Sequence, residues 1–211
     1  MKKLFLSSSF AEVSALFPEF ANEEIKGKRV TFIPTASIPE SVKFYVGAGK
    51  KALEKLGLIV DELEIATATN EEISKKILEN DYIYVTGGNT FFLLQELKRT
   101  GADNVITEQI NSGKIYIGES AGSMILSPDI EYVREMDDRR KATELDNNLA
   151  LSIIKFYPLP HHTNFPFKKA VETIIAKYES ELKLVPISNS QVITVKGNRM
   201  KIKEKTLRKI V

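Results

Sequence analysis

Glycine and serine recur in the segment Gly118-Glu119-Ser120-Ala121-Gly122 with the spacing G-x-S-x-G. The segment follows an apolar run at residues 114–118 and precedes a short helical run at residues 121–126, which is the strand–turn–helix setting of a nucleophile elbow. A serine on so sharp a turn needs small flanking residues, and the helix start directs amides and a positive dipole end at its hydroxyl. The pattern predicts Ser120 as a nucleophile, and the alternative is a glycine-rich turn with a capping serine.

A serine nucleophile needs a neighbouring base near neutral pH. The chain has only two histidines, the adjacent His161 and His162, so one of them must be that base if Ser120 is a nucleophile. They end an apolar stretch and precede a predicted helix, where the carboxyl edge of a sheet would hold them. A metal site is not favoured, because adjacent residues do not easily supply a closed ligand set and no H-x-x-E or C-x-x-C spacing lies nearby.

The third role in such a site belongs to a carboxylate that orients the histidine. Acidic residues that follow the serine are candidates for it, namely Glu131, Glu135, Asp137 and Asp138. The residue types alone do not rank them.

A second strand-to-helix turn is formed by Gly87-Gly88-Asn89-Thr90. Its glycines let a backbone N–H approach a ligand, and this N–H together with that of Ala121 could stabilise an oxyanion. Loss of one such donor costs roughly 2.7–4 kcal/mol of transition-state stabilisation. Asn89 and Thr90 are predicted substrate-binding residues. The alternatives are a tight turn with a helix cap and, less favoured because G-x-x-x-x-G-K-[ST] is absent, a phosphate-binding loop.

Composition excludes several other classes of protein. The 211 residues include no cysteine, so disulfides, thiolate metal sites and a cysteine nucleophile are excluded. The 30 basic and 28 acidic residues give a net charge of +2, which indicates no nucleic-acid partner, and the lysines after residue 196 are typical of an exposed edge strand. No signal peptide and no apolar run of about 18 residues is found, so we expect a cytoplasmic protein without a membrane segment.

Strands and helices alternate along the first two-thirds of the chain. Strands are predicted near residues 4–6, 29–35, 58–65, 81–86 and 114–118, with helices at residues 39–57, from residue 70 and at residues 90–99. This alternation predicts an α/β fold whose parallel sheet is covered on both faces and binds ligands at the carboxyl ends of its strands. Residues 129–150 are expected to be mainly loop, residues 164–182 a helix and residues 191–204 a hairpin. We expect one domain, residues 1–211.

Three motifs in this order resemble a known family: YVTGGNTFFLL, YIGESAGS and PHHTN. They resemble peptidase E, the aspartyl dipeptidases of a serine-peptidase family that also contains cyanophycinases. The resemblance covers residues 4 to 195. It implies a class I glutamine-amidotransferase-like fold, a three-layer α/β sandwich with a mostly parallel central sheet, here followed by a C-terminal hairpin.

The resemblance also implies roles for individual residues. Ser120 matches the nucleophile, His161 the catalytic histidine, and Gly88 and Ala121 the residues of the oxyanion hole. Glu135, followed by methionine as in the family, matches the third member of the triad. Asp137 is the reserve candidate for that role, and His162 falls on a variable position.

The implied activity is hydrolysis of short peptides through an acyl-enzyme, without a metal or organic cofactor, by a monomer or homodimer. N-terminal aspartyl dipeptides are the implied substrates, and Lys168 and Lys169 follow the histidine motif where the family has an arginine-containing stretch. Glu119 precedes the nucleophile, where familiar members carry an aromatic residue. The alternatives are a cyanophycinase-like hydrolase of β-aspartyl peptides and a non-catalytic binding module on the same scaffold.

Overall fold

The computed structural model describes residues 1–205, which form a seven-stranded sheet in the order β3-β2-β4-β5-β1-β8-β9. The first five strands of this order are parallel, whereas β8 runs antiparallel to β1 and β9 antiparallel to β8. The mostly parallel sheet and the C-terminal hairpin are therefore confirmed, with β9 at one edge. The strands are β1 (Lys3–Ser7), β2 (Arg29–Ile33), β3 (Ile59–Glu62), β4 (Tyr82–Val85), β5 (Ile115–Glu119), β8 (Gln191–Lys196) and β9 (Arg199–Glu204).

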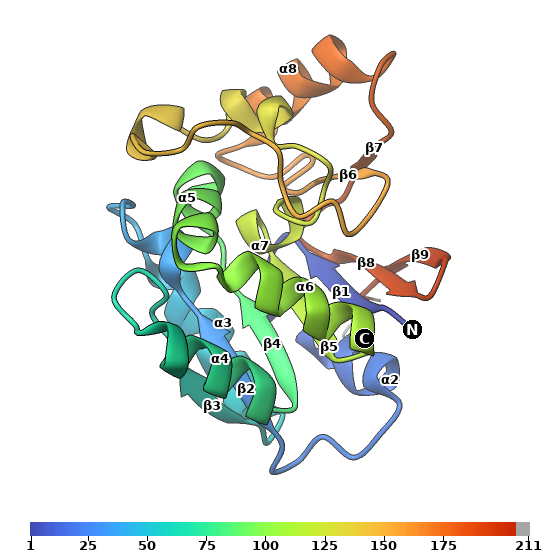
Figure 1. Cartoon of the computed structure of the whole chain (residues 1–211). Helices are drawn as coiled ribbons and strands as arrows, with labels where there is room; N and C mark the ends of the chain where they lie inside the picture. The colour runs from blue at the N-terminus through green and yellow to red at the C-terminus, as the bar shows by residue number, and fades with distance from the viewer. Residues whose placement is uncertain (206–211) are drawn as a thin grey trace, which may run out of the picture.

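Helices cover both faces of the sheet, as Figure 1 shows. One face packs against α4 (Asn70–Glu79), α5 (Thr90–Thr100) and α6 (Ala102–Ser112), and the other against α1 (Phe10–Val13), α2 (Phe17–Ala21) and α3 (Phe44–Lys55). Side chains alternate along the central strand β4, so that Ile83 and Val85 join the first core and Tyr82 and Tyr84 the second. The result is the predicted three-layer α/β sandwich.

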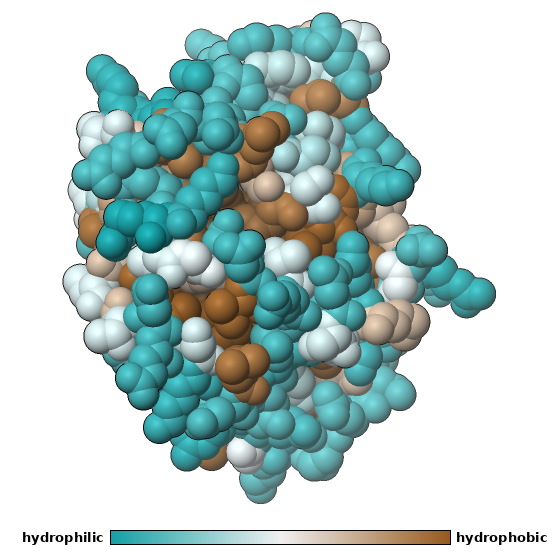
Figure 2. All heavy atoms as spheres, viewed as in Figure 1, coloured by the Kyte–Doolittle hydropathy of each residue, from teal (hydrophilic) through white to brown (hydrophobic). Residues whose placement is uncertain are grey.

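The surface seen from the same side is mostly hydrophilic, and hydrophobic residues reach it mainly across the middle of the view (Figure 2). The helices that cover the sheet thus direct their apolar sides inward, as amphipathic helices on a sheet must.

Smaller elements gather above the carboxyl ends of the parallel strands (Figure 1). Strands β6 (Tyr157–Leu159) and β7 (Leu184–Pro186) form a separate parallel pair, connected by a segment that contains α8 (Lys168–Tyr178). The short helix α7 (Ala121–Met124) follows β5 directly, and the 3-10 turns η3 (Glu131–Glu135) and η4 (Arg139–Lys141) lie in the segment expected to be loop.

Two predicted helices are shorter in the structure, and several elements were not predicted. The helix expected at residues 39–57 begins only at Phe44, and the one expected at residues 164–182 begins at Lys168, after a cis Phe165–Pro166 bond. Helices α1, α2 and α6 and the strand pair β6–β7 had no corresponding prediction. Gly101 separates α5 from α6 in a left-handed conformation, with φ of 72°, which ends one helix and starts the next.

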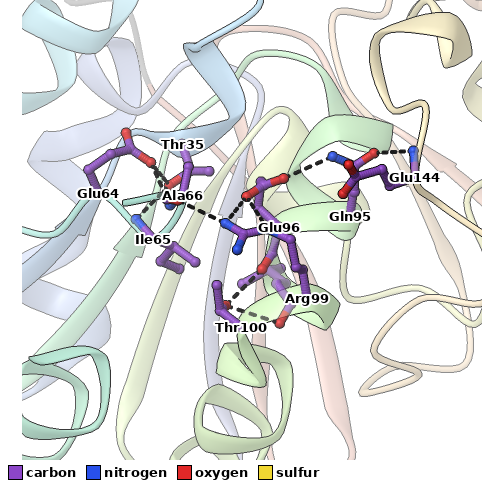
Figure 3. A network of polar contacts seen from close by, with 10 residues as sticks. Thr35, Glu64, Ile65, Ala66, Gln95, Glu96, Arg99, Thr100 and Glu144 are labelled. Carbon is purple, nitrogen blue, oxygen red and sulfur yellow. Dashed lines mark hydrogen bonds and ion pairs between the residues drawn. The ribbon is translucent and has the colours of Figure 1, made fainter. Parts of the chain in front are cut away.

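Helix α5 is fixed by a polar network at its middle (Figure 3). The buried Glu96 carboxylate accepts hydrogen bonds from Gln95 Nε2 at 2.8 Å and from Arg99 Nε at 3.0 Å. Arg99 also donates to the carbonyl of Ala66, and Gln95 Oε1 accepts from the amide of Glu144. These bonds connect α5 to Ala66 on one side and to Glu144 on the other, and they hold in place the helix that follows the glycine turn.

Candidate active site

Ser120 occupies the strained turn between β5 and α7. Its φ of 47° and ψ of −107° lie outside the regions that non-glycine residues favour, and its amide donates to the carbonyl of Ser7 on β1 at 2.9 Å. Gly122 lies so close to β4 that a Cβ atom there would be 2.2 Å from the carbonyl oxygen of Val85. The second glycine of the motif is therefore required by close backbone approach, which is the expected reason for its presence in a nucleophile elbow.

The hydroxyl of Ser120 contacts the imidazole of His161. Ser120 Oγ and His161 Nε2 are 2.9 Å apart, within the range for proton transfer. Two contacts hold the histidine in place. Its backbone amide donates a hydrogen bond to Ser8 Oγ at 3.0 Å, and its ring stacks on Phe167 with 4.8 Å between the ring centroids. The structure thus brings the predicted nucleophile and base together.

The other ring nitrogen of His161 contacts an amide group. Asn189 Oδ1 lies 3.0 Å from His161 Nδ1, and the amide of Asn189 donates in turn to Asn164 Oδ1 at 2.9 Å. An oxygen acceptor at Nδ1 favours the tautomer with its proton there, which leaves Nε2 free to accept the proton of Ser120. Burial lowers the pKa of His161, and the hydrogen bond to Asn189 opposes this shift only in part.

The structure does not bring Glu135, the expected third member of the triad, to His161. Glu135 ends η3 as an exposed residue, and its carboxylate lies 3.8 Å from Lys177 Nζ on α8. In η3 it is Tyr132 and Val133 that point into the core, which leaves Glu135 on the outer side. The reserve candidate Asp137 accepts from the amide of Thr90 instead.

Two other acidic candidates also bond elsewhere. Glu131 pairs with Arg134, and Asp138 with Arg140. Asn189 fills the place that a carboxylate was expected to hold, and it was not predicted because that expectation concerned acidic residues only.

The position of Asn189 follows from the pairing of β6 with β7, which the sequence did not predict. Leu184–Pro186 is an apolar run, and parallel strand ends meet at one edge. Because Leu159 pairs with Pro186, the residues that follow β6 and β7 are neighbours, and these are His161 and Asn189.

The turn that was predicted to supply an oxyanion donor lies against Ser120. A Cβ atom on Gly87 would be 3.2 Å from the Cβ of Ser120, and Gly88 has a φ of 136°. Among the described residues, no hydrogen bond uses the amide of Gly88 or that of Ala121. Both amides are thus free to donate to an oxygen bound beside Ser120, as an oxyanion hole requires.

The four predicted substrate-binding residues have different surroundings. Asn89 is buried and caps α5, with Oδ1 accepting from Phe92, while Thr90 is buried at the first position of the helix. Lys168 and Lys169 are exposed at the start of α8, directly after the Phe167 ring that stacks on His161. Contact of any of these four residues with substrate stays a prediction.

Two carboxyl groups, the buried Glu119 and the partly buried Asp137, lie next to the same turn. Burial raises the pKa of Glu119 to about 7, although hydrogen bonds from Phe10, Tyr84 and Gly87 oppose the shift. Burial also raises the pKa of Asp137 to about 6. None of the ion pairs found among residues 1–205 involves Glu119.

Within the described part of the chain, no group of three or more His, Asp or Glu side chains has the arrangement of a metal site. The helices found there are also too short or too polar to cross a bilayer.

Comparison with known proteins places this chain in a family. The sequence pattern of peptidase family S51 matches residues 4–203. An uncharacterized peptidase of Listeria monocytogenes is 56% identical over 200 residues, covering 95% of this chain and 97% of its own, and one of Pasteurella multocida is 52% identical over 96% of this chain and 97% of its own. Peptidase E of Nostoc is 28% identical over 77% of this chain and 66% of its own.

Solved structures agree with these sequence relatives. A crystal structure of a Listeria monocytogenes protein assigned to peptidase E superposes with a TM-score of 0.94 at 54% identity, covering 98% of this chain and 100% of that one. A peptidase from an actinobacterium shares the fold, with a TM-score of 0.71 at 22% identity over 97% of this chain and 88% of its own. The resemblance carried by the three motifs is thus confirmed, and the chain belongs to peptidase family S51 and is a peptidase.

Proposed function

We propose that this protein is a serine peptidase that cleaves short peptides through an acyl-enzyme formed on Ser120. The observation that carries the proposal is the 2.9 Å contact between Ser120 Oγ and His161 Nε2 on a strained elbow. This contact also favours catalysis over a non-catalytic binding module, because a binding site does not require a serine and an unprotonated imidazole nitrogen to face each other.

The mechanism follows from the groups at the site. His161 Nε2 takes the proton of Ser120 as Oγ attacks the peptide carbonyl, and the amides of Gly88 and Ala121 donate to the developing oxyanion. His161 then protonates the leaving amine, and it later takes a proton from the water that hydrolyses the acyl-enzyme. Asn189 holds the productive tautomer and ring orientation throughout.

For the substrate we propose short peptides, with N-terminal aspartyl dipeptides as the first to be assayed. The family to which the chain belongs supports the choice of substrate class. Lys168 and Lys169, which are exposed and directly follow Phe167 in the sequence, are the cations proposed to attract an acidic substrate side chain. A panel of α- and β-aspartyl dipeptides with leucyl dipeptides as controls tests this preference.

The test of the mechanism is Ser120→Ala, compared with Ser112→Ala on the exposed end of α6. We expect the first variant to lose peptide hydrolysis and labelling by a fluorophosphonate, and to keep the wild-type thermal midpoint. The second variant should keep both activities. Undiminished hydrolysis or labelling by Ser120→Ala would show that another residue is the nucleophile.

A further inference from the structure

The glycine turn at residues 87–90 lies between two carboxyl groups, those of the buried Glu119 and the partly buried Asp137. At its end, the amide of Thr90 donates to Asp137 Oδ2 at 2.8 Å. At its start, the amide of Gly87 is close enough to the Glu119 carboxyl to lower its pKa. The amide of Gly88, proposed as an oxyanion donor, lies between these two attachments.

Glu119 also connects the turn to two other elements. Its Oε1 accepts from the amide of Phe10 at the start of α1 at 2.9 Å, and its Oε2 accepts from the Tyr84 hydroxyl on β4 at 2.8 Å. The carboxyl therefore joins β4, α1 and the turn from the residue that immediately precedes Ser120. A change in the protonation of Glu119 can therefore affect both the turn at residues 87–90 and the elbow that carries Ser120.

The hydrogen-bond donors around Glu119 suit an ionised carboxyl better than a protonated one. A carboxylate only accepts, and backbone amides only donate, so the ionised form satisfies Phe10, Gly87 and Tyr84 together. A protonated carboxyl carries a hydrogen that an amide cannot accept, so only Tyr84 could receive it, by giving up its own donation. At Asp137 the donor is the Thr90 amide, whose hydrogen bond to Oδ2 is stronger when the carboxyl is ionised.

The charges that face the two carboxyls do not balance them. Glu119 faces Tyr84 on β4 and Tyr45 on α3, whose hydroxyls are neutral because burial raises the pKa of each. Asp137 faces Glu40 and Lys141, and these two residues pair with each other at 2.9 Å.

Tyr45 and Tyr132 are also near Asp137. Burial is thus the main influence on the pKa of both carboxyls, and it raises the pKa of Glu119 to about 7 and that of Asp137 to about 6.

We propose that Glu119 and Asp137 are positioning residues that, when ionised, hold the turn at residues 87–90 in the geometry of the oxyanion hole. The proposal rests on the proposed function, because it assigns a role to the turn in acylation of Ser120. Protonation of either carboxyl weakens the hydrogen bonds that hold the turn, because a neutral carboxyl accepts more weakly than a carboxylate, so that acylation depends on these two groups in addition to His161.

The experiment measures the second-order rate of labelling by a fluorophosphonate as a function of pH, from about pH 5 to about pH 9. This probe reports acylation of Ser120 without knowledge of the peptide substrate. We expect the wild-type rate to rise with pH more steeply than one ionisation allows. Glu119→Gln cannot ionise and, like the protonated carboxyl, carries a donor among the donors of Phe10 and Tyr84, so its rate at high pH should fall below that of the wild type. The rise that remains should be less steep and centred at a lower pH.

Two further variants sharpen the test in opposite directions. Tyr84→Phe removes a donor that favours the ionised carboxyl, so it should move the rise to a higher pH. Asp137→Asn, like Glu119→Gln, should make the rise less steep. The matched control is Glu96→Gln, a buried glutamate in the polar network of Figure 3, which should keep the wild-type pH profile.

The possible outcomes separate the two proposals. If Glu119→Gln, Asp137→Asn and Tyr84→Phe all keep the wild-type profile while their thermal midpoints change, the carboxyls serve folding only and the inference is overturned. If the wild type is labelled and the label stays in Ser120→Ala, the proposed nucleophile fails instead. A less steep profile in Glu119→Gln and an upward shift in Tyr84→Phe, each with a folded protein, support the inference.

Discussion

At the scale of single residues, the group behind the histidine is a neutral amide. Asn189 Oδ1 can fix the tautomer of His161 by accepting from Nδ1, but it brings no charge to stabilise the imidazolium that forms during acylation. The burial that lowers the pKa of His161 is therefore opposed only by a neutral hydrogen bond. The base of this site should remain unprotonated to a lower pH than one that is paired with a carboxylate.

Substitution of Asn189 tests this account. Asn189→Asp places a carboxylate at Nδ1, which raises the pKa of His161, so the acid limb of kcat/KM should move to a higher pH. Asn189→Ala removes the acceptor, and kcat should fall by about tenfold to a hundredfold because the imidazole is no longer oriented.

A control for the added charge is Asn104→Asp, an exposed position on α6. Its pH profile should match the wild type. Equal shifts in both aspartate variants would mean that the effect is a general one of net charge, and no loss of kcat in Asn189→Ala would remove Asn189 from the site.

The residues of the site differ in how far the sequence alone could identify them. Ser120 was predictable because the G-x-S-x-G spacing reflects a backbone requirement, here the approach of Gly122 to Val85. His161 was predictable because only two histidines exist. Asn189 was not, since asparagine is common in loops and its role depends on the pairing of β6 with β7, a contact between segments distant in the sequence.

At the scale of elements, the strands that carry the site were predictable and the segments around it were not. Continuous apolar runs such as residues 82–85 indicate buried parallel strands, and β4 and β5 fall where expected. Helices α1 and α2 are short, and their aromatic residues pack against Phe5 rather than follow a long helical repeat. Tertiary packing decides such elements, so local periodicity does not reveal them.

The turn between β4 and α5 gives the prediction at this scale. In Gly88→Ala the new Cβ would lie 2.1 Å from the carbonyl oxygen of Ala36, and the backbone φ of 136° is one that alanine rarely adopts. The turn must move, and with it the proposed oxyanion donor. We expect the fluorophosphonate labelling rate to fall by about 10²-fold or more, the cost of one lost donor.

Gly101→Ala is the matched control for this substitution. Gly101 also has a positive φ, of 72°, but a Cβ there meets nothing within 4 Å. That variant should lose roughly 1 kcal/mol of stability from backbone strain and keep its labelling rate. If both variants lose labelling to the same degree, backbone strain and not displacement of the turn is the cause.

At the scale of the whole molecule, the buried carboxyls make stability depend on pH. Burial raises the folded-state pKa of Glu119 from its ordinary 4.5 to about 7, so the folded chain binds this proton more tightly than the unfolded chain. The stability contributed by the proton is complete below pH 4.5 and is lost as the pH rises through about 7. Asp137 acts in the same direction, up to about pH 6.

His161 acts in the opposite direction, because burial lowers its pKa and the folded state gains stability as the pH rises towards 6.5. The total slope of stability against pH therefore mixes contributions of both signs. The contribution of Glu119 is isolated by the difference between the wild type and Glu119→Gln.

The predicted result is that Glu119→Gln becomes progressively more stable than the wild type as the pH rises from about 5 to about 8, by up to roughly 3 kcal/mol at 1.36 kcal/mol for each pKa unit. Urea unfolding at several pH values measures this difference. Ser123→Ala, which removes a buried hydroxyl that does not titrate, should differ from the wild type by the same amount at every pH. A constant difference for Glu119→Gln as well would mean that the carboxyl keeps its ordinary pKa in the folded chain. If the free energy of unfolding changes with pH as predicted and labelling increases over the same pH range, the ionised form of Glu119 positions the turn although it makes the folded protein less stable than the protonated form does.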